Sequence, residues 1–395
     1  MTRRNFVTAA AAAASSYQRI LGANERISVA HVGPGQRGRS LMRDFKRFAD
    51  TVNAEYTGVC DIFVPNRERA AAQMKEWFQR EIRQYATIDE CLADKSIDAV
   101  IISTPDFAHS IHLAKAARAG KDVYCEKPMA TVLEEGKDAV RAVRENKRVV
   151  QIGTQRRSEG RYKRAVELAK TGVMGTVTYV DIHWNVLESR WRRRDVKEVT
   201  ESNTNWKEFL LNKDARPFDP HLHHEWRLYK EFSSGIPAQW MVHQIDAVTW
   251  ILGDPYPKSC VASGGVYYWK DGRDNFDVVA AIFEFPKGWQ LNYASRLTNS
   301  YGGVQESIFG TEASMDTTNW KITSQGTKSK APDRPIEPLD DEHHMKNWLD
   351  CLRSRKDPNA TVEDGLAGSV SAIMAVESYT TGRRVEWDPQ RQRIV

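Results

Sequence analysis

The sequence is poor in cysteine and has no long apolar run. Its 395 residues include five cysteines, and no two of them form a Cys-x-x-Cys pair. So few cysteines, odd in number and widely spaced, exclude a disulfide framework and do not indicate a structural zinc site. No stretch reaches about 18 consecutive apolar residues, so the sequence predicts no membrane-spanning helix.

Charge of one sign is also scarce. The formal net charge is +5, which is small for a chain of this length. A broad basic face for nucleic acid is therefore not expected. Hydrophobic residues make up 41% and charged residues 28% of the chain, as in a globular protein, and the length suits two or three domains.

Residues 1–23 have the pattern of an export signal. Arg3 and Arg4 are followed by Phe6 and by six alanines at 9–14, which is typical of a twin-arginine signal. Such a signal predicts a periplasmic or secreted protein that is exported after folding. The alternative is a frayed N-terminal helix, and the protein is then expected in the cytoplasm.

Residues 24–150 have the pattern of a dinucleotide-binding domain. A strand-like run at 27–32 leads into Gly-Pro-Gly-Gln-Arg-Gly and then into a helical run, so that G-x-G-x-x-G stands between a strand and a helix. Gly33 allows the tight turn, Gly35 lets the backbone approach a pyrophosphate, and Gly38 lets the helix pack on the strand. The phosphates are expected at the helix N-terminus, where free N–H groups favour anions.

An acidic residue ends the next strand-like run. This run, 54–60, is followed by Asp61. A carboxylate at this position accepts hydrogen bonds from ribose hydroxyls and repels a 2′-phosphate, so the sequence favours NAD over NADP. Arg67 weakens this preference. The alternative is that Asp61 only begins a loop.

Two further strand ends belong to the same edge. The apolar run 98–103 is typical of a central parallel strand, and the short run 122–125 leads into Glu-Lys-Pro. Because the carboxyl ends of the strands form the ligand edge of an open α/β sheet, we expect a cofactor there. The predicted cofactor contacts are Gly33, Gly35, Gln36, Arg37, Gly38, Asp61, Thr104, Pro105, His109, Glu126, Lys127 and Gln155.

Residues 151–395 follow a different pattern and are expected to form a substrate-binding domain. A large, mostly antiparallel sheet with one covered face is predicted from alternating runs at 177–184, 259–269, 277–285, 289–297, 304–310 and 320–324. Helices are predicted over 161–171, 245–252, 339–353 and 363–381. The last two are expected to pack back on the first domain. The predicted fold class is α/β, with an N-terminal Rossmann domain and an α+β C-terminal domain.

The glycine loop, Asp61 and the Glu126-Lys127-Pro128 triplet together resemble the Gfo/Idh/MocA oxidoreductase family, over essentially the whole chain after residue 23. The resemblance implies that Lys127 lies beside the nicotinamide and the reacting hydroxyl. A lysine in a partly closed pocket has a lowered pKa and can relay a proton. The alternative is a solvated surface cation. The resemblance also implies a homodimer or homotetramer built on the second sheet.

A base is implied by the same resemblance. The family pattern GG-x-x-x-D-x-G-x-H-x-x-D precedes a helix, and His243 and Asp246 match its last two positions. A histidine of near-neutral pKa suits proton removal from a hydroxyl, and we expect a helix N-terminus to lower that pKa. The alternative is a histidine that caps the helix.

The sequence departs from this pattern at three positions. Ser234, Gln239 and Met241 stand where the family has Gly, Asp and Gly. Gln239 cannot ionise and therefore cannot raise the basicity of His243 by charge, but it can hydrogen-bond a substrate hydroxyl.

Polar and aromatic residues gather between 205 and 246. The spacing of His221, His223 and His224 lacks a matched set of distal ligands, so no metal site is predicted. The tryptophans suit stacking on a sugar ring, with core packing as the alternative for each. The predicted substrate contacts are Arg156, Arg157, His224, Trp226, Arg227, Gln239 and Asp246.

These patterns predict an NAD(P)-dependent oxidoreductase that acts on a sugar or cyclitol hydroxyl, with Lys127 and His243 handling the proton. An exported enzyme cannot exchange its cofactor with the cytosolic pool, so we expect NAD to be tightly bound. Two alternatives remain open. One is an NAD-dependent glycoside hydrolase that oxidises C3 transiently, eliminates, adds water and reduces again. The other is a sugar-binding protein without chemistry.

Overall fold

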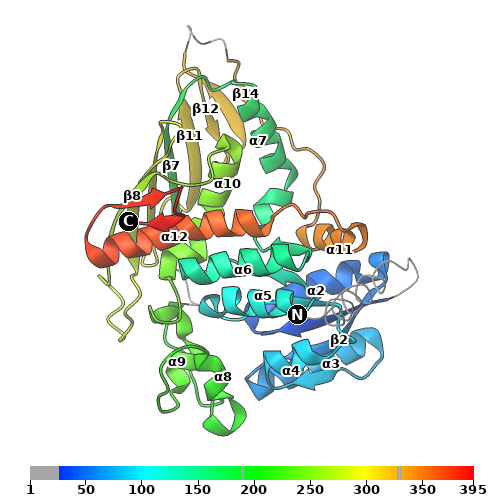
Figure 1. Cartoon of the computed structure of the whole chain (residues 1–395). Coiled ribbons are helices and arrows are strands. Elements are labelled where there is room, and N and C mark those ends of the chain that lie inside the picture. Colours follow the sequence, from blue (N-terminus) through cyan, green and yellow to red (C-terminus); the bar gives the residue numbers. More distant parts are fainter. Residues whose placement is uncertain (1–25, 188–190, 327–328, 330) are drawn as a thin grey trace, which may run out of the picture.

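The computed structural model describes residues 26–187, 191–326, 329 and 331–395. The predicted export signal at 1–23 lies outside the described residues. Two sheets of different construction dominate the described part of the chain. In Figure 1 they lie one above the other, with the N-terminal half below.

The N-terminal half forms a six-stranded parallel sheet of order β3-β2-β1-β4-β5-β6. Its strands are β1 (Ile27–Val32), β2 (Ala54–Cys60), β3 (Arg83–Tyr85), β4 (Ala99–Ile102), β5 (Asp122–Cys125) and β6 (Val150–Ile152). The connecting helices are α2 (Gln36–Ala49), α3 (Val64–Phe78), α4 (Ile88–Ala93), α5 (His109–Arg118) and α6 (Leu133–Glu145). Strand order reverses between β1 and β4, which is where open α/β sheets bind ligands. The predicted Rossmann fold is confirmed.

The C-terminal half contains a ten-stranded sheet of order β14-β13-β12-β11-β7-β10-β9-β8-β15-β16. All its neighbours are antiparallel except β7 and β10. Its strands are β7 (Val177–Asn185), β8 (Ser259–Gly265), β9 (Val278–Glu284), β10 (Gln290–Arg296), β11 (Val304–Gly310), β12 (Ala313–Asp316), β13 (Lys321–Ser324), β14 (Arg334–Pro335), β15 (Val385–Asp388) and β16 (Arg393–Ile394). The predicted mixed α+β half is confirmed. Strands β12, β14, β15 and β16 were not predicted. Each has only two to four residues, which is too short to show an alternation of apolar and polar side chains.

Three helices pack on this sheet or beside it, and a fourth reaches the first domain. They are α7 (Gly160–Lys170), α10 (Val242–Leu252), α12 (Val362–Thr381) and α11 (His344–Ser354). Trp348 and Met345 of α11 share a buried apolar cluster with Phe45 of α2, so the C-terminal part of the chain helps to close the first core. The predicted helix over 339–353 begins at His344 instead, because Leu339 and Asp341 hydrogen-bond to Gly160 in an extended segment.

Helix α10 is longer at its N-terminal end than the sequence predicts. We predicted a helix from Ile245, but α10 begins at Val242 and follows directly on a π-helical turn, Pro237–Met241. His243 therefore lies inside a continuous helical run and not at a helix N-terminus. The apolar pattern from Ile245 onward marked only the part of the run that is buried on most sides.

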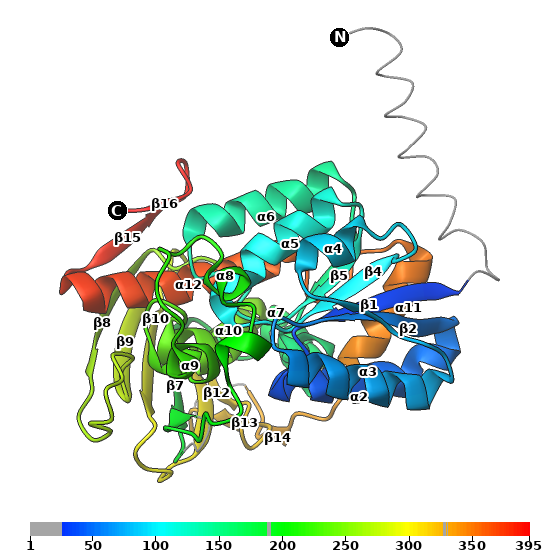
Figure 2. The ribbon, with the colours of Figure 1, turned by 90° about the horizontal axis from the view of Figure 1, so that it is seen from below.

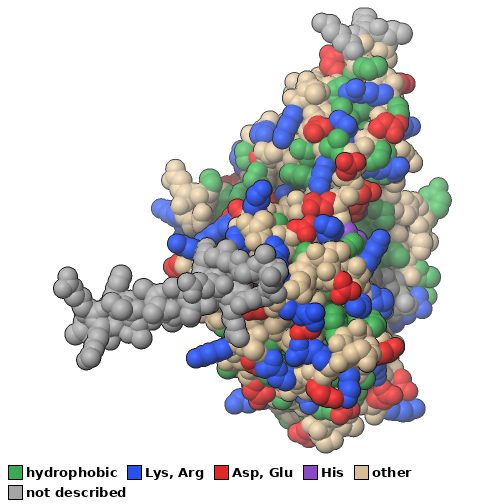
Figure 3. Space-filling view, turned by 90° about the vertical axis from the view of Figure 1, so that its right-hand side faces the viewer, with side chains coloured by type: hydrophobic (Ala, Val, Ile, Leu, Met, Phe, Trp, Pro, Cys, Tyr) green, Lys and Arg blue, Asp and Glu red, His purple; other side chains and the backbone are tan. Residues whose placement is uncertain are grey.

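Two observations concern the helices and the charged side chains of the described part of the chain. Within the described ranges, no helix is both long and apolar enough to cross a bilayer. On the face drawn in Figure 3, side chains of both charges are interspersed, without a broad basic area.

Candidate active site

A cavity of about 1190 Å³ lies at the carboxyl edge of the first sheet. One wall consists of residues that follow the parallel strands, among them Gly33, Asp61 and Lys127. The opposite wall comes from the C-terminal half and includes Trp184 and His243. Ligand sites are common in clefts between domains and at the switch point of such sheets.

The glycine loop in this cavity has the geometry that a pyrophosphate needs. Gly33 has a φ of +76°, which glycine adopts without strain. A Cβ on Gly38 would lie 2.7 Å from Ser103 Oγ, so the helix packs tightly here. A Cβ on Gly35 would meet nothing closer than Asn66 Nδ2 at 3.9 Å. The space over the N-terminus of α2 is thus open, and its free N–H groups fit an anionic group.

Asp61 lines the cavity beside this loop. Its carboxylate accepts a hydrogen bond from the N–H of Phe63 at 2.9 Å. Burial raises the pKa of Asp61 to about 7, although the hydrogen bonds from Phe63 and Asn66 oppose the shift. The guanidinium of Arg67 donates to the main-chain oxygen of Asp61 at 3.0 Å and does not contribute to the lining. The carboxylate thus remains the group available to ribose hydroxyls.

The residues after β5 form the centre of the site. Lys127 Nζ donates to the main-chain oxygen of Gln239 at 2.6 Å. Burial lowers the pKa of Lys127 to about 8, while Glu126 and Asp106 act in the opposite direction. Glu126 is itself buried and accepts a hydrogen bond from Arg37 Nε at 2.7 Å. Lys127 therefore lies in the cavity and is not a solvated surface cation.

His243 lines the same cavity as Lys127. Its ring centroid lies 6.1 Å from that of Trp184. Burial holds the pKa of His243 well below 6.5, and the positive charges of Lys127 and Arg156 lower it further. The expected low pKa thus arises from burial and neighbouring cations, and the explanation by a helix N-terminus was wrong. A neutral imidazole offers one acceptor nitrogen for a hydroxyl proton.

Asp106 is a site residue that the sequence analysis missed. It follows β4, is 1% exposed, and lines the cavity. Its Oδ2 accepts hydrogen bonds from Gln239 Nε2 and Ser233 Oγ, both at 3.0 Å, and its Oδ1 has no partner within the described residues. Gln239 Oε1 in turn accepts from Arg227 Nε at 3.3 Å. The one available signal was its place after a central strand, two residues beyond Thr104.

Most predicted site residues line this cavity. Of the predicted cofactor contacts, only Gly38 is absent from the lining, as its packing role requires. His109 also joins two loops, since its ring nitrogens lie 2.8 Å from the main-chain oxygens of Thr104 and Pro128. Of the predicted substrate contacts, those in the lining are His224, Trp226, Arg227 and Gln239.

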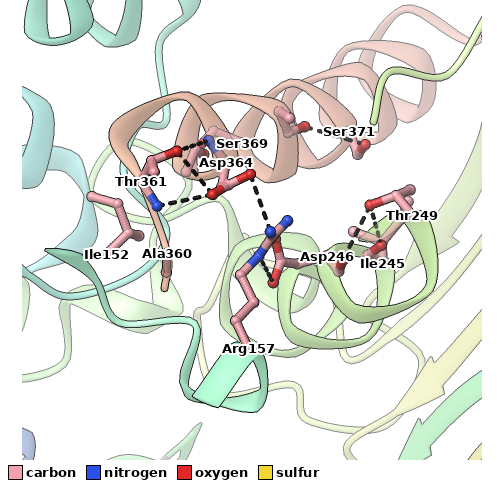
Figure 4. Close-up of polar contacts among 12 residues, drawn as sticks. Ile152, Arg157, Ile245, Asp246, Thr249, Ala360, Thr361, Asp364, Ser369 and Ser371 are labelled. Atoms are coloured by element: carbon pink, nitrogen blue, oxygen red, sulfur yellow. Dashed lines mark hydrogen bonds and ion pairs between the residues drawn. The ribbon is translucent and has the colours of Figure 1, made fainter. Parts of the chain in front are cut away.

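Arg157 and Asp246 were predicted to contact substrate, but the structure places them outside the lining. Arg157 Nε lies 3.0 Å from both carboxylate oxygens of Asp246, and its Nη1 lies 3.1 Å from Asp364 (Figure 4). The side chains of Arg157 and Asp246 are 8% and 2% exposed. Each side chain neutralises the charge of the other in the interior, where an unpaired charge is costly. The pair, together with Asp364, joins the loop of Arg157 to α10 and α12.

Arg156 also lies outside the lining. It forms an ion pair with the buried Glu306, and its guanidinium lies over the rings of Tyr162 and Trp184 at 5.2 and 5.8 Å. Arg156 therefore supports Trp184 from behind and raises the positive potential around His243.

Two of the three neighbouring histidines, His221 and His223, have separate contacts. His221 Nδ1 lies 3.0 Å from Glu225 Oε2, whereas the His223 ring packs between Phe63 and Phe209 at 5.4 and 5.2 Å. Within the described ranges, no three His, Cys, Asp or Glu side chains are grouped so as to hold a metal ion.

Two family models cover most of the chain. The oxidoreductase family model of the NAD-binding Rossmann fold matches residues 27–154, and its C-terminal α/β model matches 166–387. A scyllo-inositol 2-dehydrogenase (NAD⁺) of Bacillus subtilis is 25% identical over 314 residues, 76% of this chain and 81% of the relative.

Solved structures share the fold. An aldose-aldose oxidoreductase of Caulobacter crescentus, complexed with glycerol, has a TM-score of 0.69 at 19% identity and covers 92% of this chain and 100% of its own. The WlbA dehydrogenase of Bordetella pertussis, in complex with NADH and UDP-GlcNAcA, has a TM-score of 0.69 at 19% identity. The match covers 92% of this chain and 99% of the WlbA chain. With both family models matched in order, the chain belongs to the Gfo/Idh/MocA oxidoreductase family.

Proposed function

We propose that the protein is an NAD(P)-dependent oxidoreductase that acts on a hydroxyl of a sugar or a cyclitol. One observation carries the proposal. The amine of Lys127 is hydrogen-bonded to Gln239, one helical turn before His243, and both side chains line the cavity of the glycine loop. An amine and a neutral imidazole from two domains thus converge on a dinucleotide site.

The residues present fit NAD. The N–H groups at the start of α2 would hold the pyrophosphate, and Asp61 would hold a ribose through its hydroxyls. Asp61 favours NAD over NADP, because its carboxylate repels a 2′-phosphate. The bound nicotinamide supplies a hydride acceptor.

The polar groups of the chain then handle the proton. His243 is neutral and takes the proton of the substrate hydroxyl while the attached carbon loses its hydride. The Lys127 ammonium donates a hydrogen bond to the same oxygen and stabilises the negative charge that develops there. Asp106 raises the pKa of Lys127 and holds the Gln239 amide in place, so it is a positioning residue. Trp184 and Trp226 line the cavity and would contact the sugar ring.

Product analysis tests this function. Purified protein is incubated with NAD and a panel of cyclitols, aldoses and glycosides, and NADH and sugars are quantified. We expect NADH and a keto product in equal amounts. Reducing sugar released from a glycoside without NADH would instead establish the hydrolase, which the non-ionising Gln239 favours. Binding without any product would establish the non-catalytic alternative.

The pH dependence of NAD affinity is a specific prediction. Ribose hydroxyls donate to the ionised form of Asp61, so binding favours loss of its proton. The pKa of Asp61 in the protein without cofactor is about 7. Below pH 7 the carboxyl group must therefore lose a proton when NAD binds, and the affinity for NAD should fall by up to about tenfold per pH unit.

Titration of NADH fluorescence between pH 5.5 and pH 8 measures this dependence. Asp61→Asn should bind more weakly at neutral pH and lose most of the slope. An equal slope in the wild type and in this variant would contradict the assignment.

We also propose that the outer face of the second sheet joins copies of the chain. Val261 and Ile282 pair across β8 and β9, Tyr179 and Phe309 pair across β7 and β11, and all four are exposed. Light scattering of Ile282→Asp should show a smaller particle than the wild type.

We also propose that the chain is exported through the signal that contains Arg3 and Arg4. Localisation of an Arg3→Lys/Arg4→Lys variant tests this proposal.

A further inference from the structure

A segment of the C-terminal half lies against the first domain. Residues 204–224 contain α8 (Trp206–Leu210) and α9 (Pro220–His224), which lie beside the first domain in Figure 1 and in front of the C-terminal half in Figure 2. Thr204 forms an isolated antiparallel bridge with Phe63, and the Asn205 N–H donates to the Ile62 oxygen at 2.8 Å. The segment is thus attached immediately beyond Asp61.

Apolar packing makes a second attachment. The ring centroid of Phe209 in α8 lies 5.7 Å from that of Phe107, which follows β4, and 5.0 Å from that of Phe232. Phe107, Phe209 and Phe232 are all buried in one cluster. The segment therefore contacts both the loop after β2, in which Asp61 faces the cavity, and the loop after β4.

The inner side of this segment lines the cavity. Glu208, Phe209, Leu211 and His223 all belong to the lining. Their neighbours there include Asp61 and residues of the loops after β2 and β4. The ribose end of the proposed cofactor site thus has a largely apolar and aromatic cover.

Leu211 and His223 of this segment each have one unusual feature, and Leu211 is the C-cap residue of α8. Leu211 has a φ of +50°, a conformation that costs a branched side chain free energy and that is often kept at binding sites. His223 Nδ1 is buried and has no hydrogen-bond partner within the described residues. Burial also lowers the pKa of His223 to about 4, so the ring is neutral. Both side chains line the cavity.

We propose that residues 204–224 form a cofactor clasp, which covers the adenosine half of a bound dinucleotide and slows its release. This inference rests on the proposed function. A flat, apolar base fits a pocket walled by aromatic rings and Leu211, next to the carboxylate that takes the ribose. Because the clasp is attached both to the loop of Asp61 and to the loop after β4, we expect the adenosine to leave only when these attachments open. The clasp gives a physical basis for tight retention of NAD.

Dissociation of NADH tests the clasp. The purified protein is loaded with NADH and mixed with excess NAD, and the fluorescence decay gives the dissociation rate. We expect Leu211→Gly to release NADH about tenfold faster, as for loss of one apolar contact. Glycine adopts a positive φ without strain, which offsets part of the packing that Leu211 loses against the phenylalanine cluster, so the variant should fold with at most a modest decrease in its unfolding midpoint. His223→Ala is a second variant with the same expected direction.

Asp214→Asn is the matched control, because Asp214 is an exposed residue of the clasp that does not line the cavity. Competition separates the two halves of the cofactor. Leu211→Gly should weaken binding of AMP about tenfold and leave that of nicotinamide mononucleotide unchanged. Wild-type release rates in both clasp variants, or equal weakening of both mononucleotides, would overturn the clasp. Failure of the wild type to bind NADH at all would instead overturn the proposed function.

Discussion

Replacement of Lys127 by alanine is expected to slow hydride transfer by about 10²- to 10³-fold, the usual cost of removing one donor to a developing oxyanion. The amine donates to the main-chain oxygen of Gln239 at 2.6 Å, and in the proposed mechanism it stabilises the negative charge that develops on the substrate oxygen. His243→Ala should cost a similar factor, because no other group in the proposed mechanism takes the hydroxyl proton. Single-turnover measurements of NADH formation report the step directly.

Controls for these variants separate chemistry from folding. Lys127→Ala removes a buried cation, so we expect unchanged or increased thermal stability and retained NADH binding. Lys127→Arg keeps the charge, but the larger planar guanidinium cannot take the position of the compact ammonium beside the Gln239 main-chain oxygen, so its turnover should remain well below the wild type. Turnover within about threefold of wild type in both Lys127→Ala and His243→Ala, against the expected loss, would refute the proposed mechanism.

Loss of the Arg157–Asp246 pair is the second large effect that we expect. Arg157→Met leaves Asp246 buried at 2% exposure without its bidentate partner, and removal of one member of a buried ion pair costs about 3–5 kcal/mol. Asp246→Asn, which keeps the shape but not the charge, should also destabilise. Urea unfolding of both variants measures the change in the free energy of unfolding.

A double variant distinguishes structure from substrate binding. Arg157→Met combined with Asp246→Leu removes both charges and should recover much of the lost stability, although Asp364 then keeps only its capping contacts to Thr361. The substrate KM of folded Arg157→Met should stay close to wild type. A large increase in KM with unchanged stability would restore the substrate-contact prediction for Arg157.

The Rossmann half could be predicted from the sequence because its signals are local. The turn at Gly33 and the packing at Gly38 follow from a conformation and a volume that only glycine allows, and Gly35 keeps open the space that a pyrophosphate would take. Asp61 and Lys127 could be placed at one edge because parallel strands bring their carboxyl ends together.

Residues of the C-terminal half were harder to assign. Arg157 and Asp246 have the residue types of a polar site, but they pair with each other across 89 positions of the chain. Nothing local separates a buried pair from a substrate contact. The low pKa of His243 was expected, but its cause was assigned to a helix end that the fold does not form there.

The local pattern of the chain was sufficient for the dinucleotide loop and the parallel edge, whereas the amine and the imidazole were expected from the resemblance to the oxidoreductase family. Only the folded molecule brings Lys127 to Gln239, 112 positions along the chain, and Asp106 to the same glutamine, 133 positions along it. It also lays residues 204–224 across the loop beyond Asp61. Such contacts depend on how two separate cores pack together, because burial and charge pairing act through space and leave no periodicity in the sequence.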